Sequence, residues 1–139
     1  MANEYAEHTT LRSPLGRVRG LGSAKSGVHH WWMQRVTSIA LLPLSIWLVF
    51  ALAGMAGAGH AEAVAWIGRP LNAVLLLAFL AAAFHHTAAG VQVIVEDYAN
   101  SEWAKMATIL AMKGLCVLLW LAASLAVLRV AVGGIRFVG

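Results

Sequence analysis

The chain has 139 residues, of which 60% are apolar and only 12% are charged, and its formal net charge is +4. Soluble domains carry about 25% charged and about 45–50% apolar residues, so this composition excludes a water-soluble globular protein and indicates one membrane domain. The basic residues flank apolar segments, where they orient a membrane protein, so the positive charge gives no reason to expect nucleic-acid binding. The single cysteine, Cys116, excludes an internal disulfide and a cysteine-ligated iron–sulfur cluster held by this chain alone.

Residues 1–30 are polar and basic and contain several glycines, which disfavour a helix. We expect an arm on the cytoplasmic membrane surface here, beside lipid headgroups. The membrane domain then covers residues 31–139.

Three apolar segments predict three transmembrane helices, over about residues 36–58, 71–95 and 106–132. Each segment reaches the ~20 residues that a helix needs to cross a bilayer. Pro43 removes one backbone hydrogen bond within the first segment and predicts a kink. Hydroxyl groups in the same segment can satisfy the carbonyls that the kink frees; they belong to Thr37, Ser38 and Ser45. We expect residues 57–70 to form a loop that contains His60.

The basic residues are distributed unequally between the two ends of these helices. Seven lie at one end, namely Arg12, Arg17, Arg19, Lys25, Arg35, Lys105 and Lys113. Three lie at the other end, namely Arg69, Arg129 and Arg136. Because Lys and Arg are enriched in cytoplasmic loops, this distribution predicts a cytoplasmic N-terminus.

A histidine pair, His85 and His86, lies inside the second apolar segment. An ionisable side chain in hydrocarbon is costly and therefore suggests a functional site. Neutral imidazole is a common axial ligand of haem iron. Around His86, Ala82, Ala89 and Gly90 occupy the neighbouring positions of one helix face, and such small residues suit either a flat ring or close helix packing. The residue types leave haem ligation, a hydrogen-bonded packing histidine and a proton relay open.

Because successive helical residues are about 100° apart, His85 and His86 cannot serve one site equally. No second histidine lies at a similar depth in another apolar segment. A six-coordinate haem iron therefore needs its other axial ligand from another chain.

Two further pairs stand near the ends of the apolar segments. His29 and Arg35 flank the start of the first, where cations can pair with haem propionates or simply lie at the interface. Asp97 and Tyr98 end the second, about 18 Å along the helix from His86. A phenol there can donate to a quinone carbonyl and the carboxylate can relay a proton, although tyrosine is also ordinary at a membrane interface.

The sequence resembles the hydrophobic membrane anchor subunit of bacterial succinate dehydrogenase, which is respiratory complex II, in its haem b-binding form. The resemblance covers residues 27–132 and is carried by three stretches: Gly27-Val28-His29 with Arg35-Val36-Thr37, His86 with Gly90, and Asp97-Tyr98.

The resemblance implies that His86 is one axial ligand of haem b and that the other comes from a companion anchor protein of the same complex. It implies that His29 and Arg35 face the haem propionates. It also implies that Tyr98 binds the quinone head group, with Asp97 beside it.

By the same resemblance, the two anchors form a helical bundle in the bacterial inner membrane. The bundle holds the flavoprotein and iron–sulfur subunits on the cytoplasmic side. Electrons from succinate would pass through FAD and iron–sulfur clusters to ubiquinone, and this chain would have no catalytic activity alone. The alternatives are an anchor of a fumarate reductase and a small non-redox membrane subunit whose histidines pack or relay protons.

Overall fold

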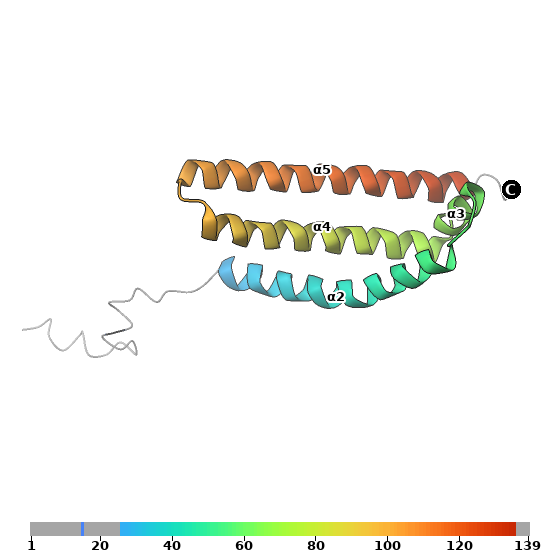
Figure 1. The fold of residues 1–139 in the computed structure, drawn as a ribbon, viewed down its shortest axis with the longest axis horizontal. Coiled ribbons are helices and arrows are strands. Elements are labelled where there is room, and N and C mark those ends of the chain that lie inside the picture. The colour runs from blue at the N-terminus through green and yellow to red at the C-terminus, as the bar shows by residue number, and fades with distance from the viewer. Residues whose placement is uncertain (1–14, 16–25, 136–139) are drawn as a thin grey trace, which may run out of the picture.

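The structure is a computed structural model that describes residues 15 and 26–135. Within residues 26–135 the chain forms four helices and no strand (Figure 1): α2 (Ser26–Gly54), α3 (His60–Ile67), α4 (Pro70–Tyr98) and α5 (Glu102–Ile135). Three stretches are long and apolar enough to cross a membrane: Gly27–Gly54, Pro70–Tyr98 and Glu102–Gly133. The prediction of an all-α protein with three membrane helices is confirmed. The predicted arm lies almost entirely outside the described residues.

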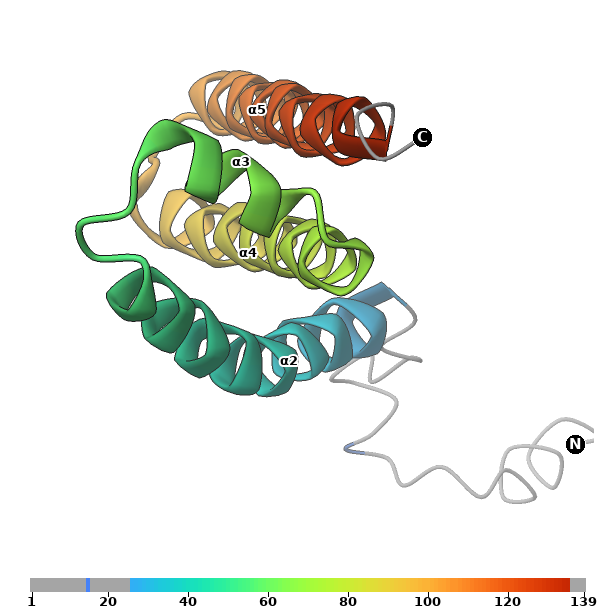
Figure 2. The ribbon, with the colours of Figure 1, turned by 90° about the vertical axis from the view of Figure 1, so that its right-hand side faces the viewer.

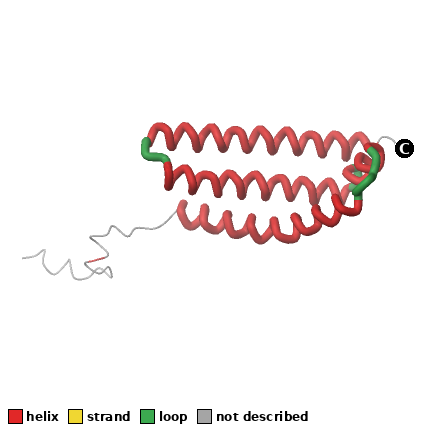
Figure 3. Tube along the Cα trace, viewed as in Figure 1, coloured by secondary structure: helices red, strands yellow, loops and turns green. Residues whose placement is uncertain are grey.

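The three long helices lie side by side with α4 in the middle (Figure 1). Viewed from the end, they form an arc in which α4 packs against both α2 and α5 (Figure 2). Short connections join the helices at both ends of the molecule (Figure 3). This up-and-down order brings the N-terminal end of α2 and the C-terminal end of α4 to the same side of the membrane.

The first helix begins earlier than the sequence suggested. We expected a helix from about residue 36 to 58, but α2 starts at Ser26, includes Gly27 and ends at Gly54. One glycine costs a helix only about 1 kcal/mol, which the packing of α2 against α4 can offset. The helix ends before Gly57, whose φ of 86° is unsuitable for continuing a right-handed helix.

The first connection is not the simple loop that we expected. His60 is the first residue of α3, and the Gly59 backbone N–H donates to the Glu62 carboxylate at 3.1 Å, which stabilises the start of this helix. Trp66 of α3 stacks on Trp47 of α2, with ring centroids 5.6 Å apart. Through this stacking, α3 packs against the C-terminal part of α2 just before the connection that leads into α4.

Pro43 lies inside α2, which continues through it as one curved helix (Figure 2). The nearby hydroxyls do not serve the carbonyl that Pro43 leaves free, which belongs to residue 39. Instead, the Thr37 hydroxyl lies 2.9 Å from the Met33 carbonyl and 3.1 Å from the Gln34 carbonyl. The Ser38 hydroxyl donates to the Gln34 carbonyl at 2.8 Å.

The described residues have almost no core of their own. Only Ala73, Ala89 and Thr37 are buried. Large apolar side chains are exposed along α2 and α5, among them Ile39, Leu42, Phe50, Leu110 and Leu118. Such surfaces are compatible with lipid or with another membrane protein, but not with water.

The turn after α2 provides a test of the backbone geometry. Gly57→Ala should lower the apparent melting temperature of the detergent-purified protein, because an L-residue at positive φ costs about 1–2 kcal/mol. Gly54→Ala is the matched control, since its added methyl group meets nothing within 4 Å and lies at ordinary helical φ. Equal melting temperatures for Gly57→Ala and the parent would contradict the positive φ.

Candidate functional site

His86 lies on α4 at its contact with α2. Its Nδ1 is 3.1 Å from the Thr37 hydroxyl oxygen and 3.5 Å from the Ser38 hydroxyl oxygen. The His86 side chain is half-buried, and Thr37 is only 7% exposed. The predicted candidate ligand is thus held on one side by two hydroxyl groups from the neighbouring membrane helix.

His85 lies in different surroundings. It is exposed on α4 and lines a pocket of about 510 Å³ formed by α4, α5 and His30 of α2. The other polar residues that line this pocket are His30, Gln92, Lys113 and Trp120. The two histidines therefore have separate surroundings, as the rotation between neighbouring helical residues requires: His86 contacts α2, and His85 faces this pocket.

The small residues beside His86 have more than one role. Ala89 is 6% exposed. A Cβ added at Gly90 would lie 3.6 Å from the Gln34 side-chain nitrogen, so Gly90 sits close to α2. Gly90 therefore leaves room for the Gln34 side chain of α2, while Ala82 is half-buried on the same helix face.

His29 and Arg35 are both exposed on α2. The Arg35 guanidinium lies over the Trp31 ring, 3.9 Å from the ring centroid, which is a cation–π contact. Arg35 is two residues from Thr37, so it lies only about 3 Å along α2 from the level of His86. His29 lies about 12 Å from that level, towards the N-terminal end of the helix.

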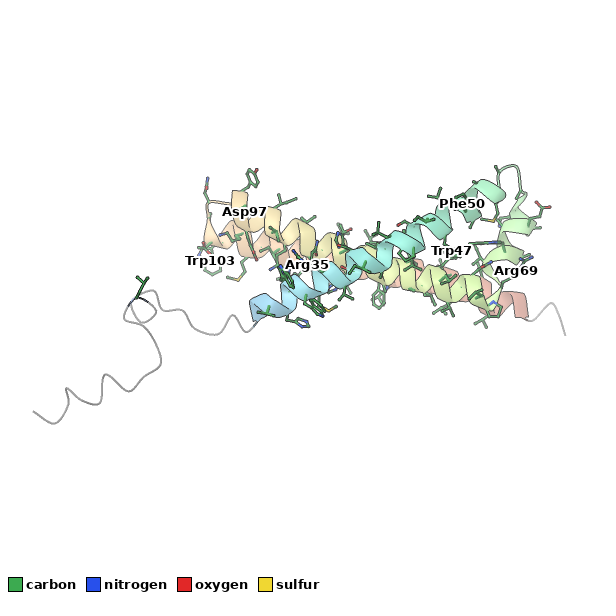
Figure 4. All side chains as sticks on the ribbon, turned by 90° about the horizontal axis from the view of Figure 1, so that it is seen from below. Arg35, Trp47, Phe50, Arg69, Asp97 and Trp103 are labelled. Carbon is green, nitrogen blue, oxygen red and sulfur yellow. The ribbon has the colours of Figure 1, made fainter. Side chains whose placement is uncertain are left out.

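Asp97 and Tyr98 are the last two residues of α4. Both are exposed, and Tyr98 is 82% exposed. Figure 4 shows Asp97 and Arg35 in the half of the molecule opposite to Trp47 and Arg69. The structure does not bring Tyr98 next to His86, because the two residues are separated by about 18 Å along one helix.

Among residues 15 and 26–135, no cluster of three or more His, Cys, Asp and Glu side chains could hold a metal ion. A single imidazole such as that of His86 would suit an axial position of haem iron, where the ring itself supplies four nitrogens and the protein supplies only the axial ligands.

Sequence reasoning missed the partner of His86. We considered Thr37 and Ser38 as groups that satisfy carbonyls near Pro43, and Thr37 also as part of a stretch that carries the resemblance, but neither as a partner of His86. The available signal was that two adjacent hydroxyl residues lie inside an otherwise apolar segment. It could not be connected to His86, because the contact joins residues 49 positions apart.

These features define a small integral membrane protein of three spanning helices with a histidine inside its central helix. The family profile described as "Succinate dehydrogenase/Fumarate reductase transmembrane subunit" matches residues 9–120, and the chain belongs to this family. The expected resemblance to the hydrophobic membrane anchor subunits of succinate dehydrogenase is confirmed, as is the expected location of a multi-pass protein in the bacterial inner membrane.

Several curated relatives carry closely similar names. The succinate dehydrogenase hydrophobic membrane anchor subunit of Rickettsia bellii is 35% identical over 105 residues, which is 74% of this chain and 82% of the relative. The protein of the same name from Paracoccus denitrificans is 29% identical over 70% of this chain and 75% of the relative. The succinate dehydrogenase membrane anchor subunit of Reclinomonas americana is 32% identical over 61% of this chain and 73% of the relative. No solved structure matches the chain.

The contact at Gly90 can be tested by substitution. Gly90→Ile should lower the apparent melting temperature of the purified protein, because the larger side chain must displace the Gln34 side chain, and overpacking costs about 1–3 kcal/mol. Gly114→Ile on α5 is the matched control, since a Cβ there meets nothing within 4 Å. If both variants melt like the parent protein, the Gln34 side chain does not occupy the space beside Gly90.

Proposed function

We propose that this chain is the membrane anchor subunit of a succinate dehydrogenase and that His86 is one axial ligand of haem b. The observation that carries the proposal is the placement of one imidazole. His86 is half-buried in a membrane helix, its Nδ1 faces two hydroxyls, and its Nε2 has no hydrogen-bond partner among the described residues. An imidazole nitrogen left free in this way is available to iron.

The other axial ligand would come from the companion anchor protein. His29 and His30 lie near the start of α2, and His60 starts α3 at the opposite end of the long helices. None of them is at the level of His86 on a neighbouring helix. Haem b, when bound, supplies one-electron redox chemistry between two such ligands.

The exposed cations of α2 would bind the carboxylates of the haem. Arg35 lies near the level of His86, and His29 lies nearer the membrane surface. Each can form a charge-assisted hydrogen bond to a propionate. The Arg35 guanidinium would then either leave the Trp31 ring to bind the propionate or contact both.

Tyr98 and Asp97 would form part of the site that reduces ubiquinone. The Tyr98 phenol would donate a hydrogen bond to a quinone carbonyl, and the Asp97 carboxylate would relay a proton to a quinone oxygen. Complete reduction adds two electrons and two protons to give ubiquinol. The electrons come from succinate, which is oxidised to fumarate in the flavoprotein subunit with FAD and iron–sulfur clusters as carriers.

The partners follow from the orientation of the chain. The excess of Lys and Arg favours a cytoplasmic position for the N-terminus and the α4–α5 turn. Tyr98 then faces the iron–sulfur and flavoprotein subunits, while the companion anchor and lipid cover the exposed apolar faces of α2 and α5. The family description includes fumarate reductase, but the relatives named above are all succinate dehydrogenase subunits, which favours succinate as the electron donor.

The haem ligand can be identified from spectra of the purified, fully assembled complex. The reduced-minus-oxidised haem b signal should be present in the parent complex and lost in His86→Ala. The matched control is His85→Ala, which should retain the signal, because His85 faces the pocket between α4 and α5. Loss in His85→Ala with retention in His86→Ala would move the ligand and the porphyrin to that pocket, and a parent complex without haem would remove the haem site altogether.

The quinone role of Tyr98 can be tested by kinetics. Tyr98→Phe should reduce succinate–ubiquinone turnover about tenfold, which corresponds to the loss of one hydrogen bond of about 1.4 kcal/mol. Succinate oxidation with an artificial acceptor should stay unchanged. Trp103→Phe is the matched control, because Trp103 is also 82% exposed and lies just after the turn that follows α4. Full quinone turnover in Tyr98→Phe would remove Tyr98 from the site.

A further inference from the structure

Thr37 is the one buried polar residue among the described residues, with 7% of its surface exposed. Its hydroxyl oxygen lies within hydrogen-bonding distance of three atoms: the Met33 carbonyl oxygen at 2.9 Å, the Gln34 carbonyl oxygen at 3.1 Å and His86 Nδ1 at 3.1 Å. This hydroxyl is the closest polar contact between α2 and the imidazole of α4.

The number of available protons determines the direction of the bond to His86. A hydroxyl group has one proton and two lone pairs, and a carbonyl oxygen can only accept. The Thr37 hydroxyl can therefore donate to a carbonyl of its own helix and accept from His86, or donate to Nδ1, and the tautomer of the imidazole decides which. If Nε2 binds iron, as proposed above, the one N–H of the neutral imidazole is on Nδ1 and donates to the Thr37 oxygen.

Ser38 leads to the same result from a second position. Its hydroxyl donates to the Gln34 carbonyl at 2.8 Å, so its lone pairs are also available to Nδ1, which lies 3.5 Å away. With the one N–H of the neutral imidazole on Nδ1, both hydroxyls are placed to accept from it, and the lone pair that binds metal is on Nε2.

We infer that Thr37, supported by Ser38, is a positioning residue that fixes His86 as its Nδ1–H tautomer and directs Nε2 towards the haem iron. The inference rests on the proposed function of His86. A hydrogen bond from the second ring nitrogen orients a metal-binding histidine and raises its basicity, and removing such a partner typically costs about 10–100-fold in metal affinity. A hydroxyl group on a packed membrane helix serves this purpose without placing a charge in the bilayer.

The test uses the purified, fully assembled complex with haem content and haem midpoint potential as readouts. Thr37→Val keeps the side-chain shape but removes the acceptor. It should lower the haem-to-protein ratio on dilution in detergent and shift the midpoint potential to more positive values, because a less basic imidazole stabilises ferric iron less. Thr37→Val with Ser38→Ala should give a larger shift than Thr37→Val alone, since no hydroxyl then remains near Nδ1.

Two further variants separate positioning from simple packing. Thr37→Ser restores the hydroxyl and should return both readouts towards those of the parent, while Ser45→Ala removes a hydroxyl elsewhere on α2 and should change neither. If Thr37→Val does not assemble, Thr37→Ala replaces it in the same comparison with Thr37→Ser. Parent-like potential and haem content in both Thr37→Val and the double variant, with haem still lost in His86→Ala, would overturn the role of Thr37 and leave His86 as ligand. Retention of haem in His86→Ala would instead overturn the proposed function.

Discussion

The contact between Thr37 and His86 fixes how α2 sits against α4. A polar side chain inside a membrane protein must find a partner, because neither lipid nor apolar side chains can supply one. The hydroxyl oxygen and the ring nitrogen are 3.1 Å apart, and a slide of either helix by one turn, about 5.4 Å, would break the contact. The contact therefore favours one register of the two helices. From this register follows the level of Arg35 near His86, whereas the up-and-down order of the helices places Tyr98 at the same end as the start of α2.

Apart from this contact, polar side chains contribute little to how the described helices pack against one another. The helices α2, α4 and α5 form an open arc (Figure 2). Among the described residues, only two apolar side chains are buried, those of Ala73 and Ala89. Both are small, as is usual where membrane helices approach closely. In water such an arc would collapse around its exposed leucine, isoleucine and phenylalanine side chains. In a membrane the same side chains can face lipid and a second protein, which is what membership of a family of transmembrane subunits leads one to expect.

Sequence reasoning predicted the features that depend on local composition. Long runs without charge were sufficient to find the three membrane helices, and the 100° rotation between neighbours was sufficient to separate His85 from His86. Prediction from the sequence failed where the local sequence signal is weak and tertiary packing determines the structure. The glycines before residue 30 suggested an arm, yet α2 already begins at Ser26. The alanine-rich segment after Gly59 was interpreted as a loop, although Glu62 and the stacking of Trp66 on Trp47 stabilise a short helix there. The partner of His86 was unpredictable for a different reason, since it depends on how two distant helices cross.

A haem held by one histidine from each of two chains has a consequence for assembly. In the proposed arrangement this chain supplies Nε2 of a ring whose other nitrogen is already engaged by α2, so much of the orientation of the ligand is set before the partner arrives. The second ligand would belong to another protein, and iron would bind tightly only where both imidazoles meet. Binding that requires the assembled state stabilises that state by mass action. Haem would then help to hold this chain, whose described residues form almost no core, in the assembled complex.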